Sequence, residues 1–174
     1  VNALSNAGLS KIEVTSFTSP TAIPALKDAE IVMREITRRP GTVYSALVPN
    51  VRGAERAIEA RTDELNLVMS ASETHNISNL RMTREQSFAS LAQVVATAQA
   101  AQVAVNVSLS CVFGCPMEGN VHASAVFDWV QRFADLGVRG ITLCDTTGMA
   151  YPTQVHQLTT AARARWPGMD FTLH

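Results

Sequence analysis

Residues 11–20, KIEVTSFTSP, separate two candidate folds. The first six form a strand-like run rich in β-branched residues, and the loop that follows contains no glycine. A doubly wound nucleotide-binding sheet usually carries a glycine-rich phosphate loop after its first strand, whereas a (β/α)8 barrel needs none. The glycine-free loop therefore favours a barrel, provided that the rest of the chain repeats the strand and helix pattern.

The rest of the chain does repeat this pattern. Five more apolar runs of strand length follow, at residues 42–48, 64–70, 103–109, 140–145 and 170–174. Between the strands, apolar residues recur at helical spacing, as Val126, Trp129 and Phe133 do. Six strands cannot close an eight-stranded barrel. We therefore expect an α/β fold, an incomplete segment of a (β/α)8 TIM barrel covering about strands 2 to 7. Residues 1–174 would form one partial domain that lacks the first and last strands.

Helix boundary signals support this repeat. Residues 1–7 are expected to be helical, and Pro24 precedes a helix that should end near residues 38–41. Thr83 and Gln86 have the spacing of a capping box, and Gly137 is placed to end another helix. Three histidines are expected to be solvated, His75 in a loop and His122 and His156 in helical segments.

Composition excludes several classes of function. Of 174 residues, 47% are hydrophobic, which allows a substantial core, and no apolar run reaches the roughly 20 residues of a membrane span. The 14 basic and 15 acidic residues nearly balance without a basic cluster among aromatics, so neither a membrane nor a nucleic acid is an expected partner. Three cysteines cannot form a disulfide framework, and the cytoplasm is the expected location.

Residues 108–120, SLSCVFGCPMEGN, contain two of these cysteines. Cys111 and Cys115 suggest a metal or redox site, but zinc sites usually pair Cys-x2-Cys with a second ligand pair elsewhere. The remaining Cys144 is isolated in a predicted strand, and Pro116 argues against the helix start that a thioredoxin-type motif needs. We therefore favour a structural or substrate-lining role over a thiol-metal or redox role.

Polar residues stand at the predicted strand ends, where barrel enzymes carry their chemistry. Glu13 is either paired in a salt bridge with a neighbouring strand or is a site carboxylate. Asp145 either caps a helix or acts as a site acid, and His174 is either a structural group or a ligand. The other polar candidates are Ser16, Asn50, Ser72, Glu73, Ser110, Cys111 and Thr146.

These segments together resemble the hydroxymethylglutaryl-CoA lyase family, of the metal-dependent lyase barrels related to isopropylmalate synthase. The resemblance runs from end to end of the chain. It rests on GLSKIEVTSFTSP (8–20), ALVPN (46–50), SASETHNISNLRMT (70–83), SCVFGCPMEG (110–119), LCDTTGMAYP (143–152) and TLH (172–174). SFTSP and SCVFGCPMEG indicate the lyase branch, whereas DTTG is shared across the superfamily.

The resemblance implies a retro-Claisen cleavage of 3-hydroxy-3-methylglutaryl-CoA to acetyl-CoA and acetoacetate, as in leucine degradation and ketone body formation. The implied cofactor is Mg2+ or Mn2+, and a homodimer is a family expectation. By the same resemblance His174 is a metal ligand, the first histidine of a His-x-His pair, and Asp145 and Glu13 are catalytic. The implied substrate contacts are Ser16, Asn50, Thr146 and Cys111.

Several family features are absent from the chain: the Arg-Asp pair of the first strand, the second metal histidine, the asparagine ligand and the glycine-rich cysteine loop. We therefore expect the isolated segment to bind metal weakly and to be inactive. Two alternatives are an acetyl-CoA-dependent condensing synthase of the isopropylmalate, citramalate or homocitrate type and an inactive barrel fragment. The loop at residues 111–119 argues against the synthase. Glu13 and Asp145 argue against the inactive fragment, because unpaired carboxylates among apolar strand residues are costly.

Overall fold

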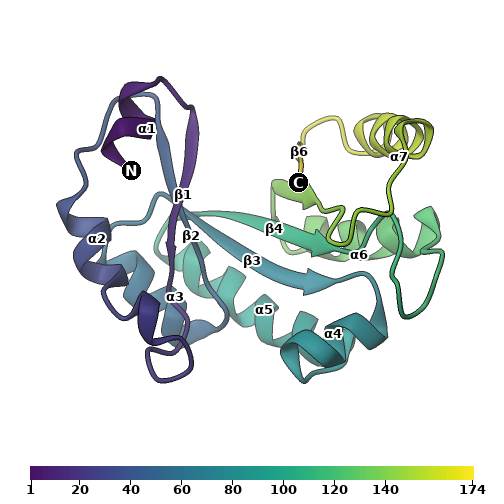
Figure 1. The fold of residues 1–174 in the computed structure, drawn as a ribbon, viewed down its shortest axis with the longest axis horizontal. Helices are drawn as coiled ribbons and strands as arrows, with labels where there is room; N and C mark the ends of the chain where they lie inside the picture. The colour runs from purple at the N-terminus through teal and green to yellow at the C-terminus, as the bar shows by residue number, and fades with distance from the viewer. The chain divides into compact units, whose positions relative to one another are not determined.

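The structure is a computed structural model that describes residues 1–174 (Figure 1). Its strands are β1 (Lys11–Ser16), β2 (Val43–Leu47), β3 (Glu64–Ser70), β4 (Ala104–Ser110), β5 (Gly140–Leu143) and β6 (Asp170–Leu173). Its helices are α1 (Asn2–Asn6), the 3-10 helix η1 (Pro24–Leu26), α2 (Ala29–Glu35), α3 (Val51–Glu59), α4 (Glu73–Leu80), α5 (Arg84–Ala100), α6 (Ala123–Asp135) and α7 (Pro152–Arg165).

The six strands form one sheet in chain order, β1-β2-β3-β4-β5-β6. The pairs β1·β2, β2·β3, β4·β5 and β5·β6 are all parallel. A doubly wound sheet reverses its strand order at a switch point, whereas a barrel adds each strand beside the last. The uninterrupted order therefore confirms the predicted segment of a TIM barrel.

The predicted strands agree with the observed ones to within two residues at each end, and residues 11–16 and 64–70 agree at both ends. The helix expected to end near residues 38–41 ends at Glu35 instead. Ile36 is extended, and the backbone N–H of Thr37 donates to Asn2 Oδ1 at 2.9 Å rather than to a helix carbonyl. The loop position predicted for His75 is also wrong, because Ser72 caps the N-terminus of α4 and His75 lies in its first turn.

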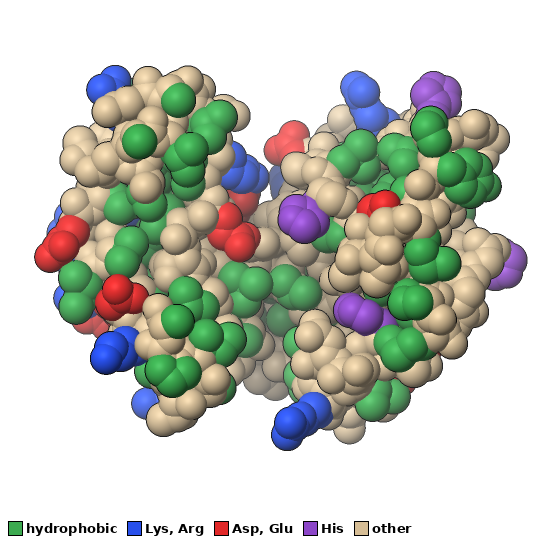
Figure 2. Space-filling model, viewed as in Figure 1, with side chains coloured by type: hydrophobic (Ala, Val, Ile, Leu, Met, Phe, Trp, Pro, Cys, Tyr) green, Lys and Arg blue, Asp and Glu red, His purple; other side chains and the backbone are tan.

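The chain divides into two compact units. Unit 1 comprises Val1–Leu67 and Ser90–Val105, and unit 2 comprises Val68–Ala89 and Asn106–His174. No helix of either unit combines the length and the apolar character needed to cross a bilayer. On the face drawn in Figure 2, charged side chains of both signs are dispersed, without a large basic patch.

The core of unit 1 forms around Tyr44 on β2, which is almost completely buried. Its hydroxyl donates to Ser5 Oγ at 2.9 Å and accepts the backbone N–H of Arg39 at 2.9 Å, so the polar end of this core side chain is satisfied. Gly53 allows α3 to approach the end of β1, because a Cβ at this position would stand 2.9 Å from the carbonyl oxygen of Phe17. The glycine therefore fixes how closely α3 packs.

The core of unit 2 contains Phe133 of α6, against whose ring Phe88 of α5 packs edge-on at 5.1 Å. The predicted capping box is present: Thr83 N–H donates to Gln86 Oε1 at 2.9 Å, and Gln86 N–H donates to Thr83 Oγ1 at 3.2 Å. Gly137 follows the end of α6 with a φ of 84°, as a helix-ending glycine does. Local capping signals in the sequence thus set these helix boundaries.

Candidate functional site

The carboxyl ends of β4, β5 and β6 are joined laterally in unit 2. The backbone N–H of Cys111, which follows β4, donates to Thr146 Oγ1 at 2.9 Å. The backbone N–H of Asp145, which follows β5, donates to the carbonyl oxygen of His174 at 2.7 Å. The predicted site residues Cys111, Thr146, Asp145 and His174 are therefore brought together along one edge of the sheet.

Asp145 organises the turn that it begins. Its Oδ1 accepts the backbone N–H groups of Met149 at 2.9 Å and Ala150 at 3.2 Å. The helix-cap alternative for Asp145 is wrong, because the N-cap position of α7 belongs to Tyr151. Two hydrogen bonds to one oxygen fix the direction of the carboxylate, and Oδ2 is not used in this turn.

His174 continues the pairing of β6 with β5, since its backbone N–H donates to the carbonyl oxygen of Leu143 at 3.1 Å. His174 is exposed, and its backbone carbonyl oxygen accepts the N–H of Asp145. One imidazole and one carboxylate are donor types that Mg2+ and Mn2+ accept. However, no group of three or more His, Cys, Asp or Glu residues could hold a metal ion. The backbone pairing of these two residues therefore brings two suitable donor types to the same strand ends, and a complete divalent-cation site is not present.

Both cysteines of the loop at residues 111–119 are free and buried. Burial raises the pKa of the Cys111 thiol. Burial would also raise the pKa of Cys115, but hydrogen bonds from the Ser72 hydroxyl and from the backbone N–H groups of Met117 and Glu118 outweigh it and lower that pKa. Cys111 has a left-handed backbone with a φ of 57°. That conformation is uncommon for a non-glycine residue, and here the Thr146 hydroxyl supports it.

Unit 1 contains the other three predicted site residues. Glu13 Oε2 accepts a hydrogen bond from Asn66 Nδ2 at 2.6 Å, so the salt-bridge alternative for Glu13 is wrong and the partner is a neutral amide. Asn50 is the N-cap of α3, and its Oδ1 accepts the backbone N–H of Gly53 at 2.9 Å. Ser16 Oγ is buried without a hydrogen-bond partner. The substrate-binding roles of Ser16 and Asn50 stay predictions.

A cavity of about 550 Å3 in unit 1 lies where β1 and β2 end, lined by Ser19, Asn50 and several basic side chains. Among these, Arg56 is paired with Glu30 at 2.5 Å, whereas Lys27 and Arg52 line the cavity without an ion pair. This cavity is at the end of the strands where barrel chemistry is expected. It suits an anionic group.

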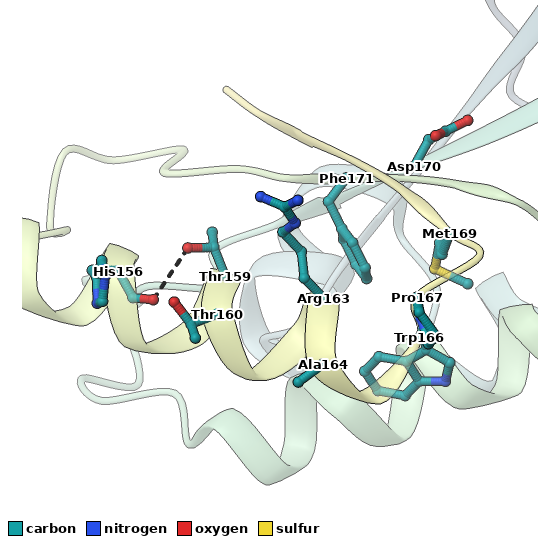
Figure 3. Close-up of a pocket in the computed structure, with 10 residues that line it drawn as sticks. All are labelled: His156, Thr159, Thr160, Arg163, Ala164, Trp166, Pro167, Met169, Asp170 and Phe171. Atoms are coloured by element: carbon teal, nitrogen blue, oxygen red, sulfur yellow. Dashed lines mark hydrogen bonds between the residues drawn. The ribbon is translucent and has the colours of Figure 1, made fainter.

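A larger cavity of about 880 Å3 lies in unit 2 between α7 and the beginning of β6 (Figure 3). Arg163, Trp166 and Phe171 are among its lining residues, and none of the predicted site residues is. The cavity reaches Asp170, the first residue of β6, whereas His174 follows the last. It is therefore at the wrong end of the strand for the predicted chemistry.

Two polar contacts around the cysteine loop did not follow from the sequence. Glu118 Oε1 accepts the backbone N–H of Thr74 at 2.5 Å, and the hydroxyl of Ser72 donates to Cys115 Sγ at 3.1 Å. Ser72 was a strand-end candidate, but nothing in the sequence indicated its contact with Cys115. The only signal for Glu118 was its place in the MEGN end of the cysteine loop.

Comparison with known proteins identifies lyases. The HMGL-like family model matches residues 1–174. The chain is 43% identical over 174 residues to the hydroxymethylglutaryl-CoA lyase YngG of Bacillus subtilis, and 33% identical over 174 residues to the mitochondrial hydroxymethylglutaryl-CoA lyase of Homo sapiens. All of this chain is covered in both comparisons, with 58% and 54% of those proteins. The chain thus spans a little over half the length of these relatives.

Solved structures show the same similarity. An HMG-CoA lyase of B. subtilis matches with a TM-score of 0.94 at 43% identity, over 99% of this chain and 58% of that one. An HMG-CoA lyase of A. baumannii, solved in complex with coenzyme A and 3-methylmalate, matches with a TM-score of 0.92 at 45% identity. That match covers 99% of this chain and 56% of the other. At 43% and 45% identity, the similarity indicates membership of the same family as well as a shared fold.

Proposed function

Because the chain belongs to the HMGL-like family, we propose that the protein containing it is a hydroxymethylglutaryl-CoA lyase. The proposed reaction cleaves 3-hydroxy-3-methylglutaryl-CoA to acetyl-CoA and acetoacetate. The end-to-end identity of 43% to a lyase of that name carries the proposal. A further support is the structure that combines a related lyase with coenzyme A, which favours an acyl-CoA ligand for this chain too.

In the proposed reaction the proton of the tertiary hydroxyl passes to a base, the bond between C2 and C3 breaks, and the electron pair forms the enolate of acetyl-CoA. Asp145 is our candidate base, because its Oδ1 is held by Met149 and Ala150 and its carboxylate is directed by the turn. Glu13, oriented by Asn66, is the second catalytic candidate. Protonation of the enolate carbon then yields acetyl-CoA.

Binding contacts follow the same strand ends. Ser16 remains a candidate contact for a polar group of the substrate, since its buried hydroxyl has no hydrogen-bond partner within the chain. Asn50, Thr146 and Cys111 remain candidate contacts, although Asn50 and Thr146 also accept backbone N–H groups in the structure. Lys27 and Arg52 line a cavity suited to an anionic portion of an acyl-CoA.

His174 is the proposed metal ligand, with Asp145 beside it. A bound Mg2+ or Mn2+ would bind the tertiary hydroxyl and the carboxylate of the substrate, and it would acidify that hydroxyl. Since the described donors do not complete a site, we expect the 174-residue segment alone to bind metal weakly and to lack turnover. A cytoplasmic location and a homodimer are further proposals, which fractionation and light scattering of the full-length protein would test.

The deciding experiment is a thioester assay on the full-length protein. One arm supplies 3-hydroxy-3-methylglutaryl-CoA and measures acetoacetate, and the other supplies acetyl-CoA with a 2-keto acid and measures free coenzyme A. Metal-dependent acetoacetate formation in the first arm supports the lyase. Activity in the second arm alone would establish a condensing synthase instead, and no activity in either would favour an inactive protein.

A further inference from the structure

The loop at residues 111–119 contacts the Asp145 turn at two points. Cys111 N–H donates to the hydroxyl of Thr146, the residue directly after Asp145. Gly114 lies against Met149, because a Cβ built on this glycine would stand 3.1 Å from Met149 Cε. Met149 is also a residue whose N–H binds the Asp145 carboxylate. The loop therefore supports the Asp145 turn at both of its ends.

The far end of this loop is attached to the first turn of α4. Glu118 Oε1 accepts the backbone N–H of Thr74 at 2.5 Å. Ser72 Oγ donates to Cys115 Sγ at 3.1 Å and accepts the backbone N–H of His75 at 3.1 Å. A carboxylate at a helix N-terminus binds N–H groups that have no partner inside the helix, and it is also favoured by the helix dipole.

The helix to which the loop is attached is itself well anchored. Asn76 of α4 is fully buried, accepts the backbone N–H of Ser70 at 2.9 Å and donates to Ser87 Oγ at 2.8 Å. On the adjacent side, Arg84 pairs with Glu73 at 2.8 Å. Because α4 is tied to the end of β3 and to the beginning of α5, it offers a fixed support for the loop.

From these contacts we propose that Glu118 is a positioning residue for Asp145: by binding the first turn of α4 it holds residues 111–119, which hold the Asp145 turn. The hydrogen bond that anchors Glu118 comes from Thr74, which is not among the predicted site residues. Burial would raise the pKa of Glu118, but hydrogen bonds from the backbone and the side chain of Thr74 contribute most to outweighing it and lower that pKa. The carboxyl group is therefore ionised at neutral pH, when its contact with the helix N-terminus is strongest.

The test uses the full-length protein and three substitutions of Glu118. Glu118→Ala removes the acceptor, and Glu118→Asp keeps the charge but is one methylene too short to keep the contact with Thr74. Glu118→Gln keeps an acceptor oxygen at the original length. Glu55→Ala, which removes an exposed carboxylate of α3 in unit 1, is the control. Local hydrogen exchange at the Met149 and Ala150 amides, kcat, KM and the urea unfolding midpoint are measured for each.

We expect Glu118→Ala and Glu118→Asp to speed exchange at these two amides and to lower kcat by about 10- to 100-fold, as misplacement of a reacting group does. KM should change less than kcat, because Glu118 is not itself a candidate substrate contact. Glu118→Gln should restore most of both properties, and Glu55→Ala should resemble the wild type. Unchanged exchange or unchanged kcat in both the Ala and Asp variants would overturn the proposal. So would a loss of midpoint stability without a local change at the two amides.

The kinetic readout rests on the proposed function, whereas the exchange readout does not. If the wild-type protein shows no lyase activity, the proposed function fails, and exchange at Met149 and Ala150 still decides whether Glu118 holds the Asp145 turn. If the wild-type protein is active and the Glu118 variants are unaffected, the function stands and the positioning role fails. The two failures are therefore distinguishable.

Discussion

Replacing Asp145 separates its charge from its role in the turn. Asp145→Asn keeps an oxygen that can accept the Met149 and Ala150 N–H groups, whereas Asp145→Ala removes both hydrogen bonds. A hydrogen bond to a charged group contributes about 1.5–3 kcal/mol to stability, and partial exposure of the two hydrogen bonds of Asp145 reduces their contribution. We expect Asp145→Ala to destabilise the full-length protein by about 1–2 kcal/mol and Asp145→Asn by about 0.5 kcal/mol or less.

Activity should follow the charge rather than the stability. Since general base catalysis contributes about 10²- to 10⁴-fold, Asp145→Asn should lower kcat by at least about 100-fold although its turn is intact. Urea unfolding followed by circular dichroism gives the stability, and acetoacetate formation gives kcat. An Asp145→Asn variant that keeps wild-type kcat would refute the base assignment. Equal destabilisation by Asn and Ala would refute the role of the two N–H contacts.

Three other substitutions test the fold and the site in the full-length protein. Asn76→Ala leaves buried hydrogen-bonding groups unsatisfied, at a cost of about 1–3 kcal/mol each. Urea unfolding should therefore show that the free energy of unfolding falls by about 2–5 kcal/mol. A change near zero would contradict the buried hydrogen-bond network. The hydrogen bond from Arg56 lowers the pKa of Glu30 in the folded protein. The ion pair therefore stabilises the fold at pH values above the unfolded-state pKa of Glu, about 4.3, and this stabilisation is lost as the pH falls through the lower folded-state pKa. Glu30→Gln should therefore reduce the fall of the urea unfolding midpoint at acidic pH. An unchanged fall at acidic pH would show that this ion pair does not cause it. His174→Ala should weaken Mn2+ binding, measured by calorimetry, by more than roughly 100-fold, which exceeds the loss expected for a residue that only supports a metal ligand. Cys115→Ser should leave the Mn2+ affinity nearly unchanged. Equal effects of the two substitutions would contradict the assignment of His174 as a ligand.

The elements that were predictable are those whose signals lie within a few residues. Strand-length apolar runs placed all six strands, because alternation and helical spacing report burial locally. The capping box of Thr83 and Gln86 was predictable for the same reason, since both of its hydrogen bonds join residues three positions apart. A resemblance carried by residue motifs also anticipated the family, and Asp145 and His174 do lie together.

The sequence by itself thus determined the repeat of strands and helices and the types of side chain at the strand ends, because these depend on local periodicity and composition. Tertiary structure alone decided which groups those side chains meet. Asn66 binds Glu13 across 53 residues, and Thr74 binds Glu118 across 44, so neither partner follows from local spacing. Parallel pairing brings together strand ends that are distant in sequence. A hydrogen bond forms only when the donor–acceptor distance lies within a narrow range of a few tenths of an ångström. Only the folded register of the strands and the packing of α4 satisfy that requirement.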